Sequence, residues 1–192
     1  MNLSNRLTMS RIVLAFVFMW FLLLPGLTNK IIAFIVFCFA SFTDFLDGWV
    51  ARRRNEISDL GKLLDPLADK VLVLSAFLSF VEMNIIAAWM VVIIIVRELL
   101  ITGLRIVAVK KGKVLEAGTS GKHKTVSQIV TIIFILIVLI ARELGTQQGF
   151  WTLRIETIAN YSIMLLMMVT IGLTVSSGFS YLWSNRHIIR SL

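Results

Sequence analysis

The amino-acid sequence predicts an all-α integral membrane protein with six transmembrane helices and a short N-terminal interfacial amphipathic helix, in a single domain over residues 1–192. Three observations support this fold class. Of the 192 residues, 58% are hydrophobic, and the mean hydropathy is +0.89. The chain contains only two prolines. Apolar runs recur along its whole length, and a helix needs about 20 mostly apolar residues to cross about 30 Å of hydrocarbon.

The elements follow in order from these runs. The first residues, MNLSNRLTMSR, mix apolar and polar side chains as a helix lying in the membrane interface does. No small-residue cleavage site follows, so we expect this segment to be retained rather than removed as a signal peptide. Six spans are predicted around the apolar runs 12–24, 31–43, 71–81, 85–96, 126–141 and 158–183. Cys38 is the only cysteine, which leaves no intramolecular disulfide and no cysteine metal site.

The basic residues predict the orientation of these spans, because cytoplasmic loops of membrane proteins are rich in Lys and Arg. One side would hold Arg6, Arg11, Arg52, Arg53, Arg54, Lys62, Arg105, Lys110, Lys111, Lys113, Lys122, Lys124, Arg186 and Arg190. The other side would hold only Lys30, Arg142 and Arg154. We therefore expect a multi-pass protein of the cytoplasmic (inner) membrane with both termini in the cytoplasm. The formal net charge of +8 is explained by this pattern and by anionic lipid headgroups rather than by nucleic acid.

Acidic residues gather in the stretch DFLDGWVARRRNEISDLGKLLDPLADK, residues 44–70, next to apolar runs where a buried charge is costly. The second and third spans would form a helical hairpin around this stretch. At about 100° per residue, Asp44 and Asp47 share one face of the second span, and Asp65 and Asp69 share one face of the third. The four carboxylates are therefore expected to converge at one depth, on the cytoplasmic side.

Four neighbouring carboxylates cannot all stay ionised without a counter-charge. Oxygen ligands without nearby His or Cys favour Mg²⁺, Mn²⁺ or Ca²⁺ over zinc, and four acids are enough for two ions about 3.5–4 Å apart. Gly48 and Gly61 leave space beside the acids for a bulky ligand. The alternative is a set of solvated carboxylates paired with the arginines at 52–54, which suits the loop residues Glu56 and Asp59 better than the four aspartates.

The spacing D-x2-D-G-x2-A-R-x8-G-x3-D-x3-D resembles the signature of the CDP-alcohol phosphotransferases. It is formed here by Asp44, Asp47, Gly48, Ala51, Arg52, Gly61, Asp65 and Asp69. The resemblance implies a six-span membrane enzyme, commonly a homodimer, in which an alcohol displaces CMP from a CDP-linked donor. It also implies two divalent metals, Mg²⁺ or Mn²⁺, in each active site.

The resemblance also implies a role for each aspartate. Asp44 and Asp65 would bridge the two metals, and Asp47 would bind one of them. Asp69 would bind the other metal and act as the general base on the incoming hydroxyl. An aspartate of ordinary pKa, near 4, is a weak base for an alcohol, so proton transfer would be late or assisted by the metal site.

Other motif positions would bind the CDP donor. The N-terminal NRLTMSR resembles an Asn-x2-Thr-x2-Arg element that family members place near the nucleotide, although Ser4 stands where many relatives have proline. The implied donor-binding residues are Asn5, Thr8, Gly48, Ala51, Arg52, Ser58 and Gly61.

Three shorter stretches bear on the acceptor: GKLLDPLADK at 61–70, RELLITGLR at 97–105 and GKHKT at 121–125. They resemble bacterial phosphatidylglycerophosphate synthases, which implies CDP-diacylglycerol as donor and sn-glycerol 3-phosphate as acceptor. A phosphorylated acceptor needs a basic pocket open to the cytoplasm, because Arg and Lys are the usual phosphate ligands. The candidates for this pocket are Arg97, Arg105, Lys122 and Lys124.

Two alternatives remain at this point. The acceptor in the same chemistry would be phosphatidylglycerol if the protein were a CDP-dependent cardiolipin synthase, and such an acceptor needs no pocket for a phosphate monoester. A protein of another class, a divalent-cation transporter, would also place acids at membrane depth but would have no need of Arg52.

Overall fold

A computed structural model of the chain describes the backbone of residues 3–54, 59–110 and 120–187, and the side chains of residues 9–43, 70–109 and 123–187. Within these ranges the chain forms six helices and no strand. They are α1 (Leu3–Leu23), α2 (Leu27–Arg54), α3 (Asp59–Glu82), α4 (Ala88–Lys110), α5 (Ser120–Gln148) and α6 (Leu153–Ser184). The predicted all-α class is confirmed, and each predicted apolar run lies mainly in a helix of its own, although the run 85–96 begins three residues before α4.

The start of the chain differs from the prediction. A separate interfacial helix was expected before the first span, but α1 runs without a break from Leu3 to Leu23. The physical reason is that the chain has no proline or glycine before Pro25 and Gly26, so nothing in the sequence interrupts the helix. Residues 3–11 are therefore the first turns of α1.

Two helices in the described part of the chain are long and apolar enough to cross a membrane, by length and composition. They are the segments His123–Gln147 and Leu153–Ser184. At 1.5 Å per residue, the 25 residues of the first extend about 37 Å, more than the hydrocarbon thickness of about 30 Å. Shorter apolar segments lie at Met9–Leu23 and Leu27–Thr43. Many large apolar side chains are exposed on these helices, among them Phe16, Trp20 and Phe179, as suits a lipid-facing surface.

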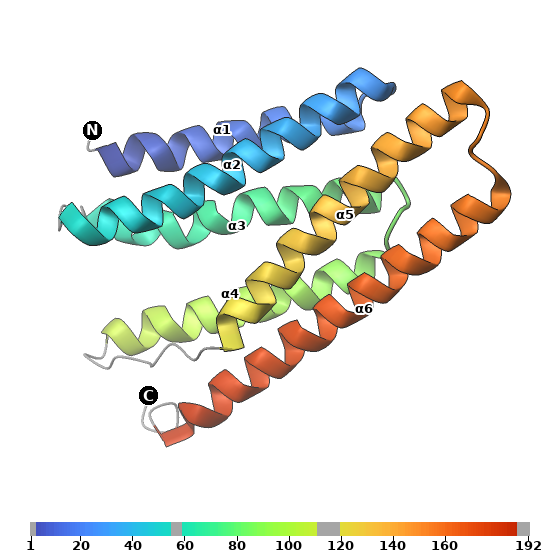
Figure 1. Ribbon diagram of the computed structural model, residues 1–192. Coiled ribbons are helices and arrows are strands. Elements are labelled where there is room, and N and C mark those ends of the chain that lie inside the picture. The colour runs from blue at the N-terminus through green and yellow to red at the C-terminus, as the bar shows by residue number, and fades with distance from the viewer. Residues whose placement is uncertain (1–2, 55–58, 111–119, 188–192) are drawn as a thin grey trace.

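The helices pack as a bundle in which α5, together with the contact between α3 and α4, joins the group α1–α3 to α4 and α6 (Figure 1). Helix α1 packs against α2 and α3, while α4 packs against α3 and α6. Helix α5 contacts α2, α3 and α6, and it crosses the bundle obliquely. The start of α1, the end of α2, the start of α3 and the ends of α4 and α6 lie toward the same side, at the left of Figure 1.

The core draws side chains from all six described helices, and its fully buried aromatic rings come from α1, α2 and α3. Phe18, Phe37, Phe77 and Phe80 are fully buried, and the rings of Phe18 and Phe37 lie 5.5 Å apart with a tilt of 51°. This tilted arrangement is one that aromatic pairs favour. Buried alanines on α1, α2 and α3 alternate with the rings and allow close helix packing.

A lysine in the first turn of α2 completes the end of α1. Gly26 has a φ of +99°, which only glycine adopts freely. Lys30, which is 4% exposed, donates from Nζ to the backbone oxygens of Leu22 at 2.5 Å and Leu24 at 3.0 Å. These contacts satisfy carbonyl groups that the end of α1 leaves unpaired, and the positive charge suits that end of the helix dipole.

Candidate active site

The backbone of the aspartate motif has the predicted form. Asp44 and Asp47 lie in the last part of α2, and Asp65 and Asp69 lie in the first part of α3. Both stretches are helical, and α2 and α3 contact each other. The helical spacing used to place each aspartate pair on one face therefore applies. The side chains of these four residues lie outside the described residues, so their convergence remains a prediction.

The donor-binding candidates also lie in the part of the chain whose side chains are not described. Asn5 and Thr8 belong to α1, Gly48, Ala51 and Arg52 to α2, and Gly61 to α3, while Ser58 lies outside the described backbone. Among the side chains that the structure describes, no three acidic, histidine or cysteine residues gather at metal-binding distance. That observation does not include the four aspartates.

A charged cluster lies next to the motif and is centred on Glu98 of α4. The carboxylate of Glu98 is paired with Lys70 of α3 at 3.2 Å, with the neighbouring Arg97 at 3.1 Å, and with Lys124 of α5. Glu98 is 5% exposed and Lys124 is 6% exposed. Lys70 directly follows Asp69 in the sequence, so the cluster begins one residue from the motif.

The three cations of this cluster are held to different extents. Lys70 also donates to the backbone oxygen of Glu98 at 3.3 Å and to the hydroxyl of Thr102, so its ammonium makes two hydrogen bonds and one ion pair. The ammonium group of Lys124 makes its one hydrogen bond among the described residues to Glu98. Three positive charges around one carboxylate leave the cluster with an excess of positive charge in a buried place, which favours binding of an anion.

Arg97 is fixed by α6 as well as by Glu98. Its Nη2 donates to the hydroxyl of Ser177 at 2.9 Å. A Cβ on Gly178 would lie 3.1 Å from Cγ of Arg97, so glycine at that position gives the arginine stem room to pass α6. The Nε of Arg97 is buried and has no hydrogen-bond partner among the described residues. A buried donor without a partner costs about 1–3 kcal/mol, which an incoming acceptor would recover.

Of the four residues predicted to bind the acceptor phosphate, the structure brings two together. Arg97 and Lys124 meet at Glu98. Arg105 is exposed, has no ion pair within the described part of the chain, and stands eight residues from Arg97, about 12 Å along the helix axis. Lys122 lies in α5, but its side chain is outside the described residues.

The sequence reasoning missed the central role of Glu98 and the participation of Lys70 and Ser177. One available signal was the position of Glu98, a lone acid within the apolar run of α4, because an ionisable residue at membrane depth usually has a partner. The identity of that partner depends on how α3, α4 and α5 pack, which the sequence pattern does not specify.

The fold and this cluster define a helical membrane protein whose buried cations are suited to a phosphate group. The chain belongs to the CDP-alcohol phosphatidyltransferase family, whose family model matches residues 1–175. The predicted family is thereby confirmed, and the protein is a membrane enzyme of that family. The transporter alternative is not retained.

Similar curated proteins extend over most of the chain. A CDP-diacylglycerol–glycerol-3-phosphate 3-phosphatidyltransferase of Bacillus subtilis is 34% identical over 202 aligned residues, covering 99% of this chain and 98% of that protein. A protein of Mycobacterium tuberculosis described as a probable phosphatidylglycerophosphate synthase is 31% identical, covering 94% of this chain and 79% of its own length. The Escherichia coli K12 protein with the same description as the Bacillus subtilis protein is 36% identical, covering 70% of this chain and 76% of its own length.

Proposed function

We propose that this protein transfers the phosphatidyl group from CDP-diacylglycerol to sn-glycerol 3-phosphate, giving phosphatidylglycerophosphate and CMP. The similar proteins of Bacillus subtilis and Escherichia coli are described by this reaction. The observation that carries the choice of acceptor is the buried cluster beside Asp69, where Arg97 and Lys124 have donors that Glu98 and Ser177 do not use.

The cluster suits a phosphate monoester for a chemical reason. A guanidinium has five N–H donors and an ammonium has three, and in Arg97 and Lys124 only part of this capacity is used within the described part of the chain. A phosphate offers several strong acceptor oxygens and a negative charge, so it would balance the excess of positive charge. Lys70, which contacts both the backbone and the carboxylate of Glu98 as well as Thr102, would hold Glu98 in place rather than bind the substrate.

Asp44, Asp47, Asp65 and Asp69 would hold two divalent metals, Mg²⁺ or Mn²⁺. The residues of the motif fit such ions, because they offer carboxylate oxygens, the ligands that Mg²⁺ prefers, from two helices that contact each other. When bound, the metal pair supplies positive charge against the phosphoryl oxygens.

The residues of the chain have distinct tasks in the proposed reaction. Asp69 accepts the proton of the 1-hydroxyl of the acceptor, whose oxygen attacks the lipid-proximal phosphorus of the donor. The bond from that phosphorus to the oxygen of CMP breaks as the new bond forms, and CMP leaves. The motif residues around Arg52 orient the CDP moiety, and Arg97 and Lys124 hold the acceptor phosphate. Most of the catalytic effect comes from alignment and charge stabilisation, as in other phosphoryl transfers.

The topology we propose has six spans, with both termini and the aspartate motif on the cytoplasmic side of the inner membrane, in a homodimer. The orientation is supported by the excess of basic residues on the side predicted to be cytoplasmic and by the arrangement of the helix ends in Figure 1, whereas the homodimer is proposed from the family resemblance alone. In this topology the acceptor pocket opens to the compartment that holds a soluble phosphorylated substrate.

The test is a comparison of acceptors. Purified protein is mixed with CDP-diacylglycerol, Mg²⁺ and either glycerol 3-phosphate or phosphatidylglycerol, CMP is measured, and the products are identified by mass. We expect CMP and phosphatidylglycerophosphate when glycerol 3-phosphate is the acceptor, and no CMP when phosphatidylglycerol is the acceptor. Cardiolipin formed from phosphatidylglycerol would assign the protein to the other acceptor, and absence of CMP with both would overturn the proposed reaction.

A further inference from the structure

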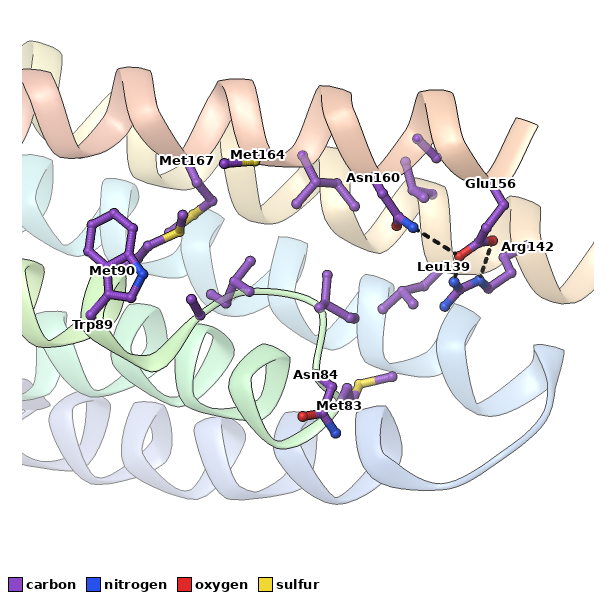
Figure 2. Close-up of a pocket in the computed structure, with 16 residues that line it drawn as sticks. Met83, Asn84, Trp89, Met90, Leu139, Arg142, Glu156, Asn160, Met164 and Met167 are labelled. Atoms are coloured by element: carbon purple, nitrogen blue, oxygen red, sulfur yellow. Dashed lines mark hydrogen bonds and ion pairs between the residues drawn. The ribbon is translucent and has the colours of Figure 1, made fainter. Parts of the chain in front are cut away.

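A cavity lies at the end of the bundle opposite to the aspartate motif. Its volume is about 520 Å³, and its walls come from the segment 83–87 between α3 and α4 and from α5 and α6. Figure 2 shows Arg142, Glu156 and Asn160 at one end of this cavity and Trp89, Met90 and Met167 at the other. Its size and its mostly apolar walls with a few polar groups are those of a ligand site.

The polar end is built around Glu156. Its carboxylate accepts hydrogen bonds from Arg142 Nε at 2.9 Å, Trp151 Nε1 at 2.7 Å and Asn160 Nδ2 at 3.3 Å, and Nη2 of Arg142 completes the ion pair. The Nη1 of Arg142 has no partner in the part of the chain that is described, and its side chain is 42% exposed. One strong donor thus remains available beside a carboxylate that is already satisfied.

The other end is apolar and reaches the middle of α6. Met167 is fully buried and Met90 is 5% exposed. Methionine side chains are flexible and adapt to irregular apolar ligands. Met167 follows Glu156 by eleven residues, which is about 16 Å along a helix. Half of a hydrocarbon core of about 30 Å is about 15 Å, so the α6 wall of the cavity is about as long as one leaflet is deep.

We propose that this cavity binds one acyl chain of a glycerophospholipid from the leaflet opposite to the aspartate motif, with the lipid phosphate on Arg142. The orientation matches, since the polar end lies at the end of the bundle and the apolar end at its middle. A charge-assisted hydrogen bond from Nη1 of Arg142 would fix the phosphate. The proposal rests on the six-span arrangement proposed above, but not on the identity of the acceptor.

The test uses phosphatidylcholine with a diazirine at the end of one acyl chain, in vesicles of phosphatidylcholine that contain the protein. After irradiation, labelled peptides are mapped by mass spectrometry. We expect label on Met90 and Met167, which are buried and line the cavity. Met168, which is 48% exposed and does not line the cavity, is the internal control, because surrounding lipid labels it in any case.

Two variants on neighbouring residues make the test specific. Ala159→Phe adds a ring to the lining of the cavity, whereas Ile158→Phe adds one at an exposed position outside it. We expect Ala159→Phe to lower labelling of Met167 about tenfold, as for a loss of about 1.4 kcal/mol of binding. Labelling of Met168 and release of CMP should not change. Ile158→Phe should leave all three readouts unchanged.

A double variant tests the polar end. Arg142→Gln with Glu156→Gln removes the phosphate donor while the lining keeps its zero net charge, and should also lower the labelling of Met167. If the wild-type protein carried label on Met168 but on neither Met90 nor Met167, the proposal would be overturned. This is the result expected if a second copy of the chain fills the cavity. Labelling of Met167 that is as strong in Ala159→Phe as in the wild type would overturn it as well.

Discussion

The ammonium group of Lys124 and the carboxylate of Glu98 form an ion pair that joins α5 to α4 across 26 residues of sequence. Both side chains are more than nine-tenths buried. A buried charge is stable only when it is paired, so each residue fixes the position of the other. The pair also fixes the position of the Lys124 N–H donors that do not bind Glu98. It therefore links the packing of the bundle to the proposed acceptor pocket.

Glu98→Gln should destabilise the protein. The substitution leaves three cations without their shared carboxylate, and removing one partner of a buried pair costs about 3–5 kcal/mol. We expect a lower midpoint of thermal unfolding in detergent and a higher KM for glycerol 3-phosphate. Glu82→Gln is the matched control, because Glu82 is exposed at the end of α3 and has no ion pair among the described residues. Equal unfolding midpoints for the two variants would contradict a central role of Glu98.

Arg97→Gln should raise the KM for glycerol 3-phosphate by about tenfold or more, since hydrogen bonds to charged groups contribute about 1.5–3 kcal/mol each. The KM for CDP-diacylglycerol should change much less, because the donor is bound by the motif. Arg105→Gln should have a smaller effect than Arg97→Gln, since Arg105 is exposed and lies apart from the cluster. Arg154→Gln, an exposed arginine near the other end, is the control. An unchanged KM in Arg97→Gln would favour phosphatidylglycerol as acceptor.

The comparison of Arg97 with Arg105 shows what the sequence predicted and what it did not. Apolar runs placed all six helices, because burial of long apolar segments follows directly from the order of residues. The sequence also indicated both arginines as candidates for the acceptor pocket. It could not show that α6 would supply Ser177 to one of them and leave the other exposed, since that depends on how the helices pack.

The start of α1 shows a second limit. An amphipathic pattern predicts which face of a helix meets lipid, but not where one helix ends and the next begins. No helix-breaking residue precedes Pro25, and the structure continues α1 without a break from Leu3 to Leu23. The roles of the four aspartates were predicted from their spacing and a family resemblance, and they stay predictions because their side chains are not among those described.

Asp69→Asn should abolish turnover while much of the donor binding survives. An amide cannot accept the proton of the attacking hydroxyl, and general-base catalysis contributes about 10²–10⁴ in rate. CMP release measures turnover, and binding of CDP-diacylglycerol is measured separately. A near-normal rate would show that another group is the base.

Asp44→Asn and Asp65→Asn should instead weaken metal binding, because each removes one carboxylate charge from the proposed site of two divalent ions. A titration of activity with Mg²⁺ would show this as a shift to higher concentration, with partial recovery of turnover at saturation. Variants that need no more Mg²⁺ than the wild type would remove these two aspartates from the metal site.

Gly178→Ala tests the position of Arg97 without removing any charge. The new Cβ would stand 3.1 Å from Cγ of Arg97, closer than most such contacts, so the arginine stem must shift away from α6. A shift that weakens the bond to Ser177 also moves the guanidinium, and we expect the KM for glycerol 3-phosphate to rise several-fold. Gly172→Ala is the matched control, because it lies in the same helix and its Cβ would meet no atom within 4 Å. Alanine is the better helix former by roughly 0.5–1 kcal/mol, so Gly172→Ala should be at least as stable as the wild type. If both variants keep the same KM, the contact between α6 and Arg97 does not position the acceptor.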